Sequence, residues 1–404
     1  MDFDYDESFR EAVARGLESV LENLTPEQLA KVQEDGGDRL ADAIGEAIPG
    51  VIEESAKGIV ESLKQDAPGM LEHRRTSQAD YEKRLADHWG AAFDLTEMVM
   101  KVASAVGEFF YEKHVPADGQ REPVFEALTR LLARACRIAE EVLVLLKAGY
   151  GQGAMARWRA LDEVATVADF IAENGDDCAQ RYFAYEAVES WNAMKEYQRH
   201  AKQLGETPYS AADVEAMRRR VDELLVRYGR RFGESYGWAQ AALEAKDPSF
   251  STKRLTLSAL RESVGTDHMA PYYRMASHGV HANPKGITWT PDALPTGDRE
   301  TILTGPSPAG LADPGHCTLI SLTRVTATTL ASKRGEATAQ LILVLLQLTD
   351  EAGDEYLRAH RDLQADERVR TANATGSSTA GAAGPFTSTG ERRTAADCRD
   401  SDTR

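Results

Sequence analysis

The chain has 404 residues, of which 42% are hydrophobic, 28% are charged and 7% are aromatic, and its formal net charge at pH 7 is −18. These proportions are ordinary for a globular protein, and the abundance of Ala, Leu, Glu and Arg favours helix. The length is large for one hydrophobic core, so we expect two domains and a tail. No apolar run approaches the roughly 20 residues that span a bilayer, and the acidic amino terminus does not resemble a signal peptide, so we expect a cytoplasmic protein without a membrane partner.

Residues 1–150 are predicted to form an acidic helical region. Apolar residues recur at three- and four-residue steps from Phe9 to Leu24, which is the spacing of one helical stripe. A break is expected near Pro49-Gly50, because proline lacks the amide hydrogen that a helix interior needs. Longer amphipathic patterns predict helices over 77–113 and 123–147.

A second domain, a helical bundle over residues 151–365, is predicted to follow a glycine-rich turn at 149–153. Its first helix should be central, because it has almost no polar face. Residues 284–315 are rich in Pro, Gly and Thr and are predicted to be loop. The expected helices of this bundle are 154–173, 177–204, 210–228, 317–331 and 336–363.

The carboxy-terminal residues 366–404 are predicted to be a disordered tail. From Thr371 onward the chain is rich in Ala, Gly, Ser and Thr and has no apolar periodicity. The predicted fold class is therefore all-α: a helical amino-terminal region, a helical bundle and a disordered tail.

Charge is distributed unevenly along the chain. Residues 1–150 carry 17 Lys and Arg against 30 Asp and Glu, whereas residues 151–290 carry 18 against 19. A polyanion meets little long-range repulsion only in the second segment. RNA is thus a possible partner of residues 151–290, and the acidic region suits a protein partner or self-association.

The four cysteines are scattered, with no C-x-x-C spacing, so neither disulfides nor a zinc site is predicted. We expect Cys136, Cys178 and Cys317 to be buried thiols and Cys398 to be an exposed thiol of the tail.

Arg159 and Glu163 lie four residues apart on the most apolar helix, with Asp162 on the same turn. Charged groups on such a helix must be paired with each other or with residues of neighbouring helices. Buried charges occur in structural clusters and at functional sites, and both interpretations remain open.

A second group of candidate site residues lies in the segment 272–284. On a continuous helix, Arg274 and His281 are about 20° apart after two turns, and His278 lies on the flank of Arg274. Tyr273 and Ser277 complete the ridge that leads to His281.

Pro284 favours a helix end just after His281. A histidine in a last helical turn interacts favourably with the helix dipole, which is a structural role. The alternatives are general acid–base catalysis and metal binding.

No cofactor or metal is predicted. The chain has no phosphate-binding loop, no dinucleotide fingerprint after a strand and no H-E-x-x-H. Four histidines and an aspartate have the right chemistry for a metal, but their spacing matches no known pattern: Asp267, His268, His278, His281 and His316.

The two groups together resemble a bacterial helical family of unknown function, DUF5677. The resemblance rests on Arg159-x-x-x-Glu163 and on Tyr273-Arg274-x-x-Ser277-x-x-x-His281-x-x-Pro284. It covers roughly Leu145 to Leu346 and implies a helical fold but no activity.

Arg274, six residues and His281 also resemble the signature of HEPN-type domains, many of which are metal-independent ribonucleases of stress and antiviral systems. That resemblance implies that His281 transfers a proton at a ribose hydroxyl and that Arg274 stabilises the charge on the phosphorane. Met275 departs from the signature, which often has a polar residue after the arginine.

Two functions therefore remain. The first is a non-catalytic interaction scaffold, which we favour slightly. The second is a HEPN-like ribonuclease or effector acting through Arg274 and His281, with Arg159, Glu163, Tyr273, Ser277 and His278 in support.

Overall fold

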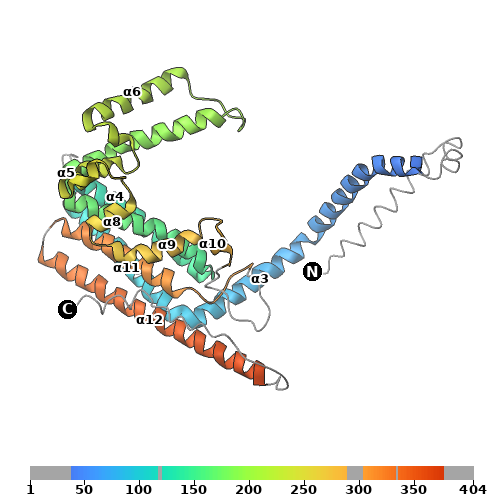
Figure 1. Cartoon of the computed structure of the whole chain (residues 1–404). Coiled ribbons are helices and arrows are strands. Elements are labelled where there is room, and N and C mark those ends of the chain that lie inside the picture. Colours follow the sequence, from blue (N-terminus) through green and yellow to red (C-terminus); the bar gives the residue numbers. More distant parts are fainter. Residues whose placement is uncertain (1–37, 117–120, 289–303, 334, 377–404) are drawn as a thin grey trace. The chain divides into compact units, whose positions relative to one another are not determined.

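The structure, a computed structural model, describes residues 38–116, 121–288, 304–333 and 335–376. Every regular element in these ranges is helical, which confirms the all-α prediction (Figure 1). The contacts divide the chain into two compact units, Met1–Tyr81 and Glu82–Arg404.

The first described helix, α3 (Asp38–His114), is continuous. The predicted break near Pro49-Gly50 was therefore wrong. A proline removes one backbone hydrogen bond and bends a helix, but the bonds of the flanking turns can carry the helix onward. The stripe predicted from Phe9 to Leu24 lies outside the described residues.

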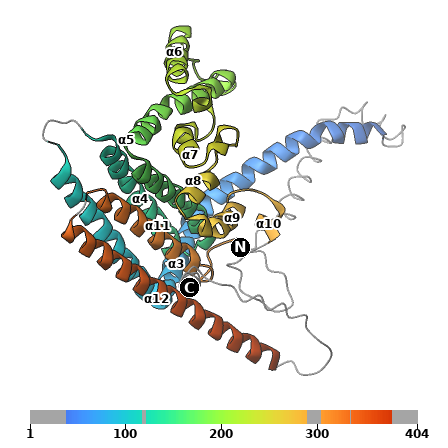
Figure 2. The same ribbon diagram turned by 60° about the vertical axis from the view of Figure 1, so that its left-hand side comes forward.

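Within the second unit, α4 (Pro123–Lys147), α5 (Gly151–His200), α11 (Ala312–Ala331) and α12 (Glu336–Gly376) form a helical bundle. Helix α11 packs against the other three (Figure 2). The predicted helix over 123–147 is confirmed. Helix α11 begins five residues before the expected start at Cys317. Helix α12 extends beyond Leu363 to Gly376, so the prediction of a disordered tail was wrong over residues 366–376, and residues 377–404 lie outside the described residues.

Helix α11 lies in the interior although its sequence contains several threonines and serines. Thr318 donates to the carbonyl of Pro314 at 2.7 Å, and the indole of Trp158 donates to Ser321 Oγ at 3.0 Å. Because each hydroxyl has a partner, its burial avoids the cost of an unpaired polar group.

Glycines set the close packing of α11 on α12. A Cβ on Gly315 would overlap the ring of Tyr356, and a Cβ on Gly353 would lie 2.5 Å from Nε2 of His316. Tyr356 is fully buried, and its hydroxyl lies 3.0 Å from Oγ1 of Thr96 on α3. Each helix thus contributes one glycine to receive a ring from the other.

The glycine-rich turn between α4 and α5 packs closely against the loop that precedes α11. Gly149 has φ 80°, and its carbonyl accepts from the Ser307 amide at 2.9 Å. A Cβ on Gly151 would come within 2.5 Å of the carbonyl oxygen of Gly310. The loop before α11 therefore closes on this turn.

Helix α5 contains a kink at Gly175, where φ is 74° and ψ is −164°. The two helices predicted over 154–173 and 177–204 are thus one element with a bend between them. Its second half packs against α6 (Ala211–Tyr228), which Ser210 caps by accepting from the Asp213 amide at 3.2 Å. We call this pair of helices, residues 176–228, the arm.

Short helices follow the arm and lie largely along α5. In chain order they are η1 (Arg230–Gly233), η2 (Gly237–Ala239), α7 (Gln240–Lys246), η3 (Pro248–Ser251), α8 (Leu257–Ser263), η4 (Asp267–Met269), α9 (Ala270–His278) and α10 (Pro284–Thr288).

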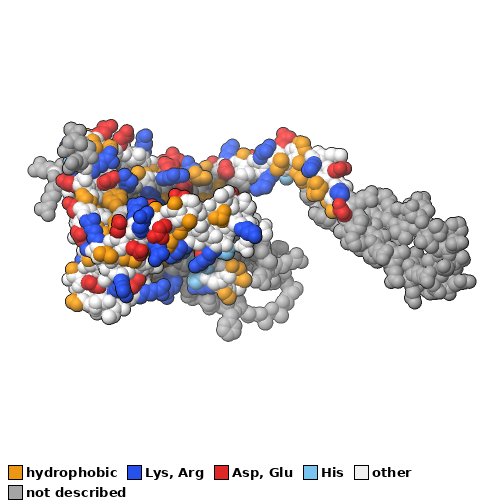
Figure 3. All heavy atoms as spheres, turned by 90° about the horizontal axis from the view of Figure 1, so that it is seen from above, with side chains coloured by type: hydrophobic (Ala, Val, Ile, Leu, Met, Phe, Trp, Pro, Cys, Tyr) orange, Lys and Arg blue, Asp and Glu red, His pale blue; other side chains and the backbone are white. Residues whose placement is uncertain are grey.

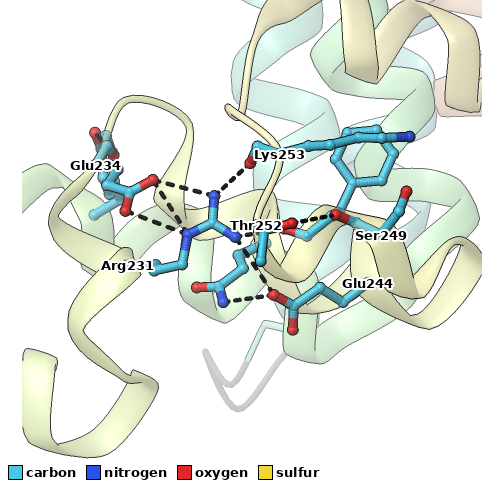
Figure 4. A network of polar contacts seen from close by, with 9 residues as sticks. Arg231, Glu234, Glu244, Ser249, Thr252 and Lys253 are labelled. Atoms are coloured by element: carbon cyan, nitrogen blue, oxygen red, sulfur yellow. Dashed lines mark hydrogen bonds and ion pairs between the residues drawn. The ribbon is translucent and has the colours of Figure 1, made fainter.

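Arg231 ties several of these short helices together (Figure 4). Its guanidinium lies 3.2 Å from Glu234 and 3.6 Å from Glu244, and it donates to the Lys253 carbonyl at 2.6 Å. Since the planar group offers five donors in a fixed geometry, one arginine can satisfy all three segments.

Two of the predicted buried thiols are buried, Cys178 and Cys317, whereas Cys136 is half-buried. Cys398 lies outside the described residues. None of the helices in the described ranges is both long and apolar enough to cross a membrane.

Candidate functional site

Asp162 of α5 and Arg261 of α8 form a buried ion pair. Their side chains are 1% and 3% exposed, and Nη2 of Arg261 donates to Oδ2 of Asp162. Burial raises the pKa of the Asp162 carboxyl, and the nearby Arg261 guanidinium partly opposes that rise. The pair fixes α8 against α5.

Glu163, the next residue of α5, accepts a hydrogen bond from the hydroxyl of Tyr236 at 2.7 Å. Tyr236 precedes η2 and has φ 56°, the left-handed region that non-glycine residues rarely occupy. Burial and the Glu163 carboxylate both raise the pKa of the Tyr236 phenol, which therefore stays protonated as a donor.

Arg159 contacts α9 through an aromatic ring. Its guanidinium carbon lies 4.6 Å from the ring centre of Tyr273, and that of Arg261 lies 3.9 Å from the same centre. Glu163 is thus paired with another element, and Arg159 contacts another element through the Tyr273 ring, whereas the two side chains are not paired with each other. We call Arg159, Asp162, Glu163, Tyr236, Arg261 and Tyr273 the α5 cluster.

A second polar group lies two turns further along α5. Asp169 pairs with Arg324 of α11 and accepts from the hydroxyl of Thr328, while Nη2 of Arg324 lies 3.3 Å from Oγ1 of Thr266. The positive charge of Arg324 also opposes the rise in the pKa of Asp162 that burial causes. The charged residues of α5 thus hold both the short helices and α11.

The predicted helical face shared by Arg274 and His281 was wrong. Helix α9 ends at His278, and His281 lies in the bend that follows. Asn283 begins a new helix instead: its Oδ1 accepts from the Gly286 amide at 2.8 Å, and Pro284 occupies the first position of α10. This capping arrangement favours a fresh start over continuation of α9.

The candidate residues of segment 272–284 therefore have different surroundings and do not form one group. Tyr273 is half-buried in the α5 cluster, and Ser277 donates to the Tyr273 carbonyl at 2.8 Å. His278 is half-buried with Nδ1 3.2 Å from Oδ1 of Asn283, so its ring belongs to the end of the helix. Arg274 and His281 are both exposed.

The described residues offer no metal site, and a hollow among them lies apart from the candidate residues. No group of three or more His, Cys, Asp or Glu in these ranges could hold a metal ion. A hollow of about 660 Å³ lies between α3 and α4, where Lys147 pairs with Glu97. It contains none of the residues singled out from the sequence.

Sequence reasoning missed Arg261, Tyr236 and Arg324. Arg261 follows Leu257 and Leu260 on a short helix that the apolar spacing did not single out, and Tyr236 lies in a turn. Partners about 70 to 160 residues away carry no local signal, although a buried Asp162 and a half-buried Asp169 do indicate that distant cations are needed.

Residues 125–290 match the model of a family described as "Family of unknown function (DUF5677)". The match begins in α4 and ends just after α10, so it includes all of the α5 cluster and the segment 272–284. It confirms the family suggested by the Arg159 and Tyr273–Pro284 motifs, over somewhat different limits. No curated protein and no solved structure matches the chain.

Proposed function

We propose that this chain, whose residues 125–290 match a family of unknown function, is a non-catalytic interaction module. The observation that carries the proposal is the apolar stripe of α6, which its own chain covers only in part. Val221 is the one buried residue of α6, and its neighbours on that stripe are half-buried: Val214, Met217, Leu224, Leu225 and Tyr228.

Helices in proteins draw most of their stability from the packing of an apolar face. Further contacts would therefore stabilise the arm. Large apolar side chains also lie open on it: Leu204 is 64% exposed, Tyr209 47% and Val226 88%. We propose that the arm meets a protein surface, and specifically a second copy of this chain, because α6 carries both acidic and basic residues along its length, which the same helix of a second copy can complement.

The α5 cluster also supports this proposal, because most of its charged groups have structural partners. Asp162 and Arg261 neutralise each other in the interior, and Glu163 is occupied by Tyr236. Groups held in this way position helices.

The test is self-association of the full chain, measured by sedimentation velocity. Val226→Glu and Leu204→Glu place a charge on the arm at exposed positions, where folding should be unaffected. Val144→Glu, at a position on α4 that is about as exposed as Leu204, is the matched control. We expect the two arm variants to be more monomeric than the wild type and the control. A wild-type chain that is monomeric throughout the micromolar range would contradict the proposal.

The alternative is a HEPN-like ribonuclease. One observation favours it: Arg274 and His281 are both exposed, so RNA could reach either side chain. Against it stands the end of α9 at His278, which separates the two residues onto different elements. A cleavage assay with the wild type, Arg274→Ala and His281→Ala decides, because activity lost in both variants with unchanged melting would replace the scaffold proposal.

RNA binding without cleavage has little support from charge. Arg220 lies 3.3 Å from Glu186 and Arg218 lies 3.7 Å from Asp222, so acidic groups accompany the basic residues of the arm. On the face that Figure 3 shows, basic and acidic side chains are likewise interspersed. Single-sign fields are what attract polyanions over a distance.

A further inference from the structure

Arg159 is a positioned cation without an anionic partner. In the described part of the chain it makes neither an ion pair nor a hydrogen bond, and the Tyr273 ring at 4.6 Å is its recorded contact. The other charged members of the α5 cluster are paired, since Asp162 binds Arg261 and Glu163 accepts from Tyr236.

A cation–π contact helps to hold the Arg159 guanidinium in place. The guanidinium carbons of Arg159 and Arg261 lie 4.6 and 3.9 Å from the ring centre of Tyr273, and the attraction between cation and ring favours these positions. A planar guanidinium that is already oriented loses less conformational freedom when it forms hydrogen bonds than a mobile surface arginine does. By contrast, Arg274 on the same helix as Tyr273 is exposed.

Arg159 is also partly withdrawn from water. The residue is half-buried, and its Nε is buried with no hydrogen-bond partner, while the Nη atoms are not among the buried unsatisfied ones. Desolvation on one side strengthens the interaction of the charge with an anion on the other. Guanidinium groups bind carboxylate and phosphate oxygens through two parallel hydrogen bonds.

The interior beside Arg159 has unmet hydrogen-bonding capacity as well. Oδ1 of Asp162 and Nε of Arg261 are buried and unpaired among the described residues, next to the same Tyr273 ring. Buried polar atoms of this kind are few in folded proteins, and ordered water or a bound group commonly explains them. Of the two, Nε of Arg261 is a donor, the type of group that an oxyanion satisfies, whereas Oδ1 of Asp162 is an acceptor that only a donor such as water can satisfy.

We propose that Arg159, held by Tyr273, binds a small oxyanion, namely a carboxylate or phosphate group. This site is independent of the arm and of self-association. The proposed site does not include Arg274 or His281.

The test is binding to the full-length chain in chloride buffer of constant ionic strength. Sodium phosphate and sodium acetate are titrated separately, with the melting temperature and isothermal calorimetry as readouts. We expect at least one salt to raise the melting temperature of the wild type in a saturable manner. Phosphate alone would identify a phosphate group as the ligand, and acetate alone a carboxylate.

Arg159→Gln removes the charge, and Arg159→Lys keeps the charge but not the planar fork. We expect Arg159→Gln to weaken binding at least about tenfold and Arg159→Lys to weaken it less. Arg274→Gln is the matched control and should bind as the wild type does. Tyr273→Leu, which releases the guanidinium, should weaken binding while Arg159 is still present.

Three results would overturn the proposal. One is a wild-type chain that neither salt stabilises, and another is equal binding by Arg159→Gln and the wild type. The third is a loss in Arg274→Gln as large as that in Arg159→Gln, which would indicate nonspecific charge screening. Circular dichroism of each variant establishes that the comparison is made between folded chains.

Discussion

The ring of Tyr356 lies directly over Gly315, so close that a Cβ on the glycine would come within 2.5 Å of ring atom Cε1. Because Tyr356 is fully buried and its hydroxyl lies 3.0 Å from Oγ1 of Thr96, the ring cannot move aside without losing that contact. The Gly315→Ala substitution should therefore overpack the interface of α11 and α12. We expect a loss of about 1–3 kcal/mol in the free energy of unfolding, measured by urea denaturation followed by circular dichroism.

Gly90→Ala is the matched control for this prediction. Gly90 lies in helix α3, and a Cβ there would meet no atom within 4 Å. The same chemical change should stabilise the chain by roughly 0.5–1 kcal/mol, because alanine favours helix. If Gly315→Ala were as stable as Gly90→Ala, the packing argument would fail.

Loss of Arg261 should be more damaging than loss of both members of its ion pair. Arg261→Met leaves the carboxylate of Asp162 buried without its cation, which costs about 3–5 kcal/mol. Adding Asp162→Leu removes the unpaired charge and should restore much of the stability. Urea midpoints of the two single variants and the double variant form the cycle, and additive losses would refute the coupling.

The stability of the Arg261→Met variant should depend on pH in a defined direction. A carboxyl whose pKa is raised on folding holds its proton more tightly when folded, so its contribution to stability improves as the pH falls. Burial raises the pKa of Asp162, and Arg261→Met removes the largest opposing interaction. The deficit of Arg261→Met relative to the wild type should therefore shrink from about pH 7.5 to about pH 5. A constant deficit would show that Asp162 does not titrate there.

Removal of the Tyr236 hydroxyl should also weaken the fold. Tyr236→Phe deletes the donor to Glu163 at 2.7 Å and leaves a half-buried carboxylate without it. Hydrogen bonds to charged groups contribute roughly 1.5–3 kcal/mol, and we expect a loss within that range at neutral pH. Tyr150→Phe, on an exposed tyrosine, should change stability little by the same denaturation assay.

Cys136 and Cys178 should react slowly with thiol reagents. Burial raises the pKa of Cys136 to about 11 and that of Cys178 to about 12. At pH 8 only about a thousandth of Cys136 is thiolate, and thiolate is the reactive form. In a Cys398→Ser background, mass spectrometry after brief exposure to iodoacetamide should find little label on either residue, and more on Cys136 than on Cys178. Rapid stoichiometric labelling of the native chain would contradict this.

Helices with a strong apolar period could be predicted well from the sequence. The spacing from Val124 to Leu145 predicted α4, and the nearly continuous apolar face after Trp158 predicted the buried first half of α5. These features depend on neighbours within one or two turns, which a sequence displays directly.

The candidate site could be predicted only in part. The sequence showed that Arg159 and Glu163 required partners, and Tyr273 proved to be one of them. It did not show that α9 ends at His278, because the decision rests on the Asn283 cap and on the fit of Gly286 between the carbonyls of His278 and His281. Contacts between residues that come together only in the folded chain therefore decide whether one helix continues or a second one begins.

The short helices return along α5 in reverse order, and this bears on how the chain folds. Contacts near the arm join residues close in sequence, and contacts near the start of α5 join distant ones. The separations are 49 residues for Tyr185 with Glu234, 73 for Glu163 with Tyr236 and 99 for Asp162 with Arg261.

Closing a loop costs more entropy as the loop lengthens, but each contact formed shortens the loop that the next must close. We therefore expect this part of the chain to fold as a zipper that starts at the arm and finishes at Arg159 and Tyr273. In a kinetic series, substitutions at Tyr185 should slow folding, whereas those at Tyr273 should mainly speed unfolding. The last residues to be fixed in place would then be those that hold the proposed anion.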